Sequence, residues 1–185
     1  MATNKVNLGI GMATGMFYTA PAGTALPASP LDTLAADWVL AGAVSADGIE
    51  WTPNKDSEPL RNWAKIVERL VAGDEGGTVG ASLMYTTEDT LKVIFGDDNV
   101  TVTPATNTHG KLISVTVEPG VSASPKAFLF LMKDGDDTIM LGTENGILRD
   151  VDAVTFAPTE AINWDTTIEA AAWTLVKDDG QLAKI

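Results

Sequence analysis

His109 is the residue best suited to acid, base or metal chemistry, because it is the only histidine among the 185 residues and the chain has no cysteine. It lies in a polar segment, residues 105–110, that predicts a loop. A zinc site would need further histidine or cysteine ligands. A serine hydrolase would depend on this same histidine, and no Gly-x-Ser-x-Gly turn is present to expose a serine. The residue types therefore argue against both a zinc site and a serine hydrolase.

Carboxylates are the other groups that could do chemistry. Asp134, Asp136 and Asp137 suggest calcium, but Thr138 takes the fifth position of the calcium loop and no glycine takes the sixth, so a solvated hairpin turn fits better. Residues 9–15 approach the dinucleotide fingerprint with one residue too many before the third glycine, and no phosphate-binding lysine follows. We expect no metal and no cofactor. A carboxylate pair for glycoside hydrolysis needs no fixed spacing, so the sequence leaves it open.

Composition limits the classes of protein further. The 25 acidic residues against 12 basic ones give a formal net charge of -13, which argues against tight binding to nucleic acid phosphates. The length fits one domain, residues 1–185. Residues 6–31 carry no charge, but their glycines and prolines break any long apolar run, so we expect neither a targeting signal nor a membrane span.

The elements that would position these groups are mainly strands, because glycine and proline punctuate short apolar runs. Residues 111–118 and 166–175 alternate as half-buried strands do. Residues 128–132 (FLFLM) are apolar throughout, which predicts a strand covered on both faces. Residues 133–137 (KDGDD) predict a hairpin turn.

Helices and loops are fewer. Residues 87–95 predict one short helix, with Thr86 or Thr87 as the N-cap and Gly96 at the end. Residues 59–71 also have helical spacing of apolar side chains. Residues 22–37 and 54–58 predict loops. The tryptophans suit either the core and subunit contacts or a sugar-binding platform: Trp38, Trp51, Trp63, Trp164 and Trp173.

A series of short signatures runs along nearly the whole chain. In order and spacing it resembles the major tail tube proteins of long, non-contractile-tailed bacteriophages, over roughly residues 8–182. The signatures are residues 15–27 (GMFYTAPAGTALP), 41–49 (AGAVSADGI), 60–63 (LRNW), 87–96 (TEDTLKVIFG) and 172–173 (AW).

The resemblance implies a mainly β fold, a β-sandwich or barrel with one short flanking helix. Six copies would form a ring whose inner strands join into one continuous barrel, and stacked rings would form a hollow tube that conducts DNA from capsid to host. It also implies a strand, not a helix, at residues 65–71, paired with residues 78–85. Residues 1–18 would form an N-terminal arm and residues 22–50 a long loop for contacts between subunits or rings.

The function implied is structural, not enzymatic. The partners implied are further copies of the chain, the tape measure protein, the tail terminator and the distal tail protein. DNA would pass without specific binding, acids on the inner wall would repel its phosphates, and no membrane would be involved. The location implied is the virion tail, with assembly in the host cytoplasm.

The resemblance also implies residues that contact other subunits or rings. Many relatives have an arginine in the strand after the Asp-Gly hairpin, and residues 138–142 (TIMLG) lack it, so a charge contact there is not expected. The contact residues we expect are Phe17, Tyr18, Pro21, Gly23, Thr24, Pro27, Gly42, Asp47, Gly48 and Trp63.

Three alternatives stay open on the sequence alone. Two are structural: the tube of a phage-derived bacteriocin, or a capsid decoration protein. The third is a secreted β-sandwich that binds carbohydrate through its tryptophans. Retention of a monomer on polysaccharide would favour the third, whereas self-assembly would disfavour it.

Overall fold

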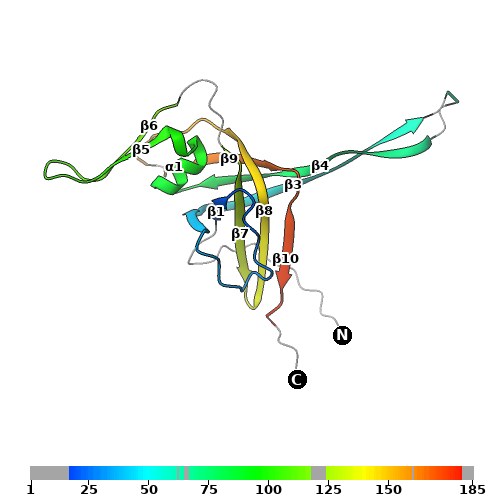
Figure 1. Cartoon of the computed structure of the whole chain (residues 1–185), viewed down its shortest axis with the longest axis horizontal. Coiled ribbons are helices and arrows are strands. Elements are labelled where there is room, and N and C mark those ends of the chain that lie inside the picture. Colours follow the sequence, from blue (N-terminus) through cyan, green and yellow to red (C-terminus); the bar gives the residue numbers. More distant parts are fainter. Residues whose placement is uncertain (1–16, 62, 65–66, 118–123, 160, 181–185) are drawn as a thin grey trace.

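The computed structural model describes residues 17–61, 63–64, 67–117, 124–159 and 161–180. Most of the expected N-terminal arm lies outside these residues. The fold is mainly β with one α-helix, as the sequence predicts (Figure 1). The elements of the described part are β1 (Phe17–Pro21), β2 (Val39–Gly42), β3 (Val44–Arg61), β4 (Val67–Leu83), α1 (Glu88–Phe95), a 3₁₀ turn (Asp97–Asn99), β5 (Val100–Thr103), β6 (Leu112–Val115), β7 (Lys126–Asp134), β8 (Asp137–Val151), β9 (Trp164–Ala170) and β10 (Thr174–Asp178).

One antiparallel sheet forms the body, in the order β2-β1-β7-β8-β9-β4-β3, with β10 also paired to β8. The first half of β8 pairs with β10 and its second half pairs with β9. The sheet bends where β8 changes partner, so that β7, β8 and β10 run crosswise to β3, β4 and β9 (Figure 1). A separate hairpin, β5 and β6, lies beside α1.

The core has two parts, one on each face of the β1-β7-β8 half of the sheet. Strand β7 supplies both, because Phe128 and Phe130 face the larger cluster with α1, while Leu129 and Leu131 face the smaller one. This confirms that residues 128–131 are covered on both faces. Each buried side chain of this size contributes roughly 1.5–3 kcal/mol, so β7 is the main anchor of the fold.

Helix α1 begins and ends as predicted. Thr87 is the N-cap and its Oγ1 accepts a hydrogen bond from the Thr90 amide. Gly96 follows the last turn with a φ of 90°. The buried Thr90 hydroxyl donates to the Ala41 carbonyl of β2, while Leu91 and Ile94 pack into the larger cluster. These contacts fix the helix against the sheet.

The segment with helical spacing, residues 59–71, is extended in the described residues. Strand β3 runs to Arg61 and β4 starts at Val67, and Pro59 pairs with Leu70. The strand expected at residues 65–71 is therefore confirmed for residues 67–71. The pairing expected with residues 78–85 is wrong, because residues 67–71 and 78–83 belong to the same strand, β4, and residues 67–71 pair with residues 58–61 of β3. The loop predicted at residues 54–58 is wrong, because these residues continue β3. Pairing between β3 and β4 determines the conformation of both segments. The spacing of apolar residues in the sequence does not predict which strands pair.

Two other predictions need correction. The single strand expected at residues 166–175 is interrupted at residues 171–173, where the sheet bends and β9 gives way to β10. Of the expected long loop, residues 22–38 and residue 43 lie outside strands, because residues 39–42 and 44–50 belong to β2 and β3. The Asp134 turn is the expected two-residue hairpin, with Gly135 at a φ of 63°.

Candidate functional site

The most unusual feature of the chain is a long two-stranded arm, formed by the described residues of the range 54–76. Strand β4 pairs with β9 only over residues 77–83, so β3 and β4 pair only with each other beyond that point. The arm therefore extends far from the body (Figure 1). Trp63 lies in the turn at its end, with a fully exposed side chain (103% relative accessibility).

The base of the arm is fixed by two glycines and a tryptophan. A Cβ on Gly76 would lie 2.7 Å from the Ala170 carbonyl oxygen, and one on Gly77 would lie 2.8 Å from the Thr52 carbonyl oxygen. Gly76 also has a φ of +150°. The Trp173 indole N–H donates to the Gly77 carbonyl at 2.9 Å. Glycine is required at both positions because neighbouring backbone approaches closely.

The loop of residues 22–38 is packed on its own chain. The Gly23 amide donates to the Glu144 carbonyl of β8 at 2.8 Å, and Thr24 Oγ1 donates to the Pro21 carbonyl at 2.7 Å. Leu26, Leu34 and Trp38 cover the smaller core cluster. Pro21, Gly23 and Pro27, three of the expected contact residues, are at least partly exposed along this loop. Their contact role stays a prediction.

Phe17 and Gly42, by contrast, are interior positions. Phe17 is fully buried, and its ring stacks on Phe130 at 4.8 Å between centroids and on Phe128 at 5.9 Å. Gly42 is buried against Tyr85 and Thr90. Tyr18 is half-buried against the smaller cluster. Phe17 presents no surface to a neighbouring subunit, and its structural role is in the core.

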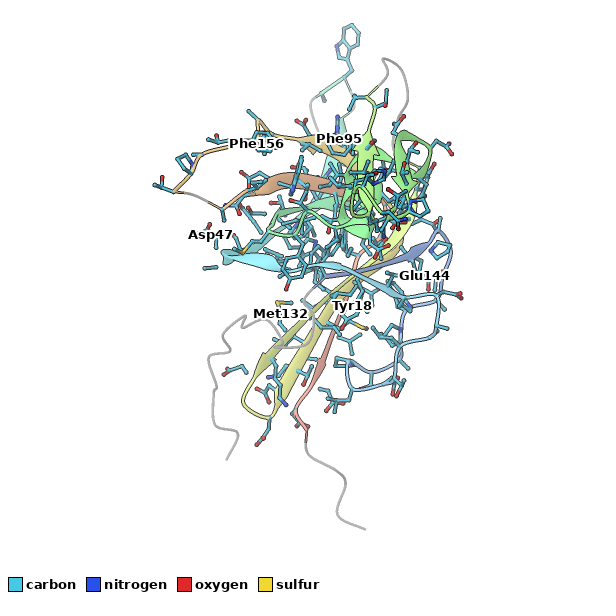
Figure 2. All side chains as sticks on the ribbon, turned by 90° about the vertical axis from the view of Figure 1, so that its left-hand side faces the viewer. Tyr18, Asp47, Phe95, Met132, Glu144 and Phe156 are labelled. Atoms are coloured by element: carbon cyan, nitrogen blue, oxygen red, sulfur yellow. The ribbon has the colours of Figure 1, made fainter. Side chains whose placement is uncertain are left out.

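Asp47 and Gly48 lie in a bulge of β3, where the pairing with β4 is interrupted between Val44 and Ile49. Gly48 takes a φ of 79°, and the Ser45 hydroxyl donates to Asp47 at 3.3 Å. Figure 2 shows Asp47 and Glu144, which anchors the 22–38 loop, on opposite sides of the body. Apart from Phe17, Tyr18 and Gly42, the expected contact residues are thus distributed over the end of β1, the 22–38 loop, the bulge and the arm.

The bulge borders a polar surface that the sequence analysis did not identify. Outward-facing positions align across four strands: Glu50 lies opposite Gly80, Gly80 opposite Thr167, and Thr167 opposite Asp150. We call this surface the acidic face. The carboxylates on it or at its border are Asp47, Glu50, Asp150, Asp152, Asp165 and Glu169.

The side chains that β4 contributes to the acidic face are small, so they project little from the sheet. Its positions on β4 are Thr78, Gly80 and Ser82, and the opposite side of the same strand packs Val79, Ala81 and Leu83 into the core. Arg149 is a cation at this surface and pairs with Glu169 at 2.5 Å. The alternation of small polar and apolar residues at 78–83 indicates in the sequence that one side of this strand is exposed. The acids come from other strands, and only the order of strands in the sheet brings them to the same surface.

Glu88 of α1 is at the centre of a small ion-pair network. Lys111 and Lys92 both lie 2.6 Å from its carboxylate oxygens. The hydrogen bond from Lys111, and to a lesser extent the one from Lys92, lowers the pKa of Glu88 from 4.5 to about 2. The same contact raises the pKa of Lys92. Since Lys111 precedes β6, this network attaches the β5–β6 hairpin to the helix.

His109 and Asp137, two of the residues considered for chemistry, contact other groups of their own chain. His109 lies in the expected loop, with Nδ1 2.8 Å from the Gly110 carbonyl oxygen. Asp137 is buried beside Lys177, at 3.2 Å. Over the described ranges, no three acidic or histidine side chains are grouped so that they could hold a metal ion. No helix among the residues in Figure 1's coloured ribbon is long and apolar enough to cross a membrane.

The tryptophans do not form a platform. Trp38 and Trp164 are buried, and Trp51 and Trp173 are partly buried against the larger cluster. Only Trp63 is fully exposed among the five, all of which lie in the described part. A sugar-stacking surface needs several exposed rings together, so the structure does not support the carbohydrate-binding alternative.

Comparison with known proteins gives the context for these surfaces. Residues 1–183 match the model of a family described as phage tail tube protein. Among solved structures, the chain is similar to the tube-terminating cap of the anti-feeding prophage, with a TM-score of 0.49 and 11% identity, over 96% of this chain and 100% of that one. No curated protein sequence matches the chain significantly.

Proposed function

Since the chain belongs to the phage tail tube protein family, a family of structural and not enzymatic proteins, we propose that it is the repeating subunit of a tail tube. In this proposal six copies form a ring, rings stack into a hollow tube, and DNA passes through the tube from capsid to host. The chain is a component of the phage tail. The tape measure protein, tail terminator and distal tail protein are its proposed neighbours in the virion, after assembly in the host cytoplasm.

The observation that carries the proposal is the combination of an open sheet with the acidic face. In the described residues, β2 and β3 each pair with a strand on one side only. An unpaired strand edge presents free amide and carbonyl groups that favour pairing with another chain. Closing copies into a ring satisfies these edges. The symmetry of the ring would then place the acidic faces of all copies at the same distance from its axis.

We assign the acidic face to the inner wall of the tube. Its strands β3, β4 and β9 lie at the β3 edge, where copies would join into a continuous barrel. Carboxylates such as Glu50 and Asp165 would repel DNA phosphates, and the small side chains of β4 offer little for DNA to bind. DNA would therefore move through without being held.

Immunogold labelling tests the assignment to the tail. Antibodies raised against the purified protein are expected to label phage tails along their whole length. Labelling of the capsid alone would favour a decoration protein, and labelling of a tail-like particle that has no capsid would favour the bacteriocin alternative.

DNA conduction needs a separate test. Phage carrying Glu50→Lys and Asp165→Lys are expected to form tails of normal length but to eject DNA more slowly, because phosphates would bind the new cations. The matched control is Asp32→Lys and Asp98→Lys, which places the same charges at exposed sites outside the acidic face. Ejection at the same rate in both variants would contradict the assignment of the inner wall.

A further inference from the structure

Trp63 has no role in the isolated chain. Its side chain is fully exposed at the end of the arm, whereas the other four tryptophans pack in or against the core. Exposed tryptophans that become buried in a partner are typical energetic hot spots of protein interfaces. The arm holds this residue far from the body on two strands that pair only with each other (Figure 1).

A cavity of about 450 Å³ lies on the body, between α1 and the end of β1. Its apolar lining includes Ala20, Val93 and Pro125, and Lys92 and Lys126 bring cations to it. Cavities of this size commonly hold small organic groups, and a cation beside an aromatic ring adds a favourable interaction. The cavity therefore offers both an apolar surface and cations to an indole ring.

The charges of the two surfaces are complementary. Residues 60–66 (LRNWAKI) contain two cations and no acid. Asp37 and Asp89 line the cavity, and neither makes an ion pair within the part of the chain that the structure describes. Lys126, by contrast, is already paired with Asp97 at 2.7 Å. The carboxylates of Asp37 and Asp89 would attract the two cations in this segment of the sequence.

The other cavities are less suitable for the indole. One of about 520 Å³ lies at the base of the arm itself, between Thr52 and Glu169. Another, of about 290 Å³, is bordered by Asp47, Glu50 and Asp165 and belongs to the acidic face. Of these three cavities, which are lined by described residues, the cavity at α1 combines apolar side chains with two acids, Asp37 and Asp89, on a surface not assigned to the inner wall.

We propose that the Trp63 indole of one copy inserts into the α1 cavity of the next copy. Figure 1 shows the arm extending away from one side of the body and α1 on the other side, so one chain cannot make this contact with itself. A contact between two different surfaces is heterologous, and it repeats from copy to copy. The inference rests on the proposed tube function and adds the residues that join the copies.

Assembly of a Trp63→Ala variant is the first test. The concentration needed for tubes, measured by sedimentation and negative-stain electron microscopy, is expected to rise about 30-fold, as for a typical hot spot. The fold should survive, because the side chain contacts nothing in the monomer. Phe156→Ala is the matched control, since Phe156 is also an exposed aromatic residue (74%) and lies outside the arm. Assembly of Trp63→Ala at the wild-type concentration would overturn the proposal.

Disulfide cross-linking tests the location of the contact, because the chain has no cysteine of its own. Ala64→Cys combined with Ala22→Cys places thiols beside Trp63 and at the cavity. Oxidised tubes of this variant are expected to give a ladder of covalent multimers. Ala64→Cys with Ser82→Cys, on the acidic face, is the control and is expected to stay monomeric on denaturing gels.

The outcomes separate this inference from the proposed function. Tubes that form but cross-link only through the control pair, or through neither pair, would refute the docking of Trp63 and leave the tube function standing. Wild-type protein that never assembles, together with antibodies that fail to label phage tails, would refute the tube function and the docking together.

Discussion

Replacing Phe17 by alanine separates a core role from a contact role. The resemblance to tail tube proteins predicts that Phe17 contacts other subunits, whereas the structure buries it completely against Phe128 and Phe130. A contact residue would affect assembly and leave the monomer stable. A core residue would affect the monomer first.

The expected cost follows from the burial. Phe17→Ala removes a whole ring from a site where its neighbours Phe128 and Phe130 are themselves about 1% exposed, so little can move in to fill the space. Substitutions of this kind destabilise by about 3–5 kcal/mol. For a domain of this size each kcal/mol lowers the melting temperature by about 2–4 °C, so we expect a fall of roughly 6–20 °C.

Thermal and urea unfolding of the monomer, followed by circular dichroism, measure this cost. Phe156→Ala is the control, because it removes the same ring from an exposed site (74%) and should change stability by no more than about 0.5 kcal/mol. A Phe17→Ala monomer as stable as the control, with assembly lost, would refute the core role and restore the contact role.

Three further predictions concern the helix, the arm and one ion pair. Thr87→Ala removes the N-cap and should cost about 1 kcal/mol in urea unfolding, with Thr87→Ser close to wild type. Gly76→Ala should destabilise by more than 1 kcal/mol, because its Cβ would meet the Ala170 carbonyl and its φ is positive; a neutral effect would contradict the close approach at the base of the arm. The folded-state pKa of Glu88 is lowered from 4.5 to about 2, so its stabilising effect is complete above pH 4.5 and is lost as the pH falls through 2. The stability difference between wild type and Glu88→Gln should therefore shrink between pH 4.5 and 2, and a constant difference in urea unfolding across this range would show that the carboxylate charge contributes nothing.

The sequence predicted those elements whose signals are local. The cap at Thr87, the Gly135 turn and the apolar run of β7 each depend on neighbouring residues, and the structure has all three. The helical spacing of residues 59–71 was misleading because pairing between β3 and β4 determines that segment. The resemblance to tail tube proteins, and not periodicity, predicted the strand.

The candidate site was harder to predict, because it depends on the order of strands in the sheet. Glu50, Asp150 and Asp165 are far apart in sequence and come together only through β4 and β9. Phe17 was given a contact role by the resemblance and by its place in the uncharged residues 6–31, and only its pairing with β7 shows that it belongs to the core. Trp63 lies within the apolar helical spacing of residues 59–71, which favours burial, whereas the structure exposes it fully at the end of the arm; its contact role stays a prediction.

Cryo-electron microscopy of the assembled wild-type protein tests the central claim most directly. We expect a hollow tube of stacked six-membered rings, with Glu50 and Asp165 facing the lumen. Filaments without a lumen, or tubes with the acidic face on their outer surface, would contradict it.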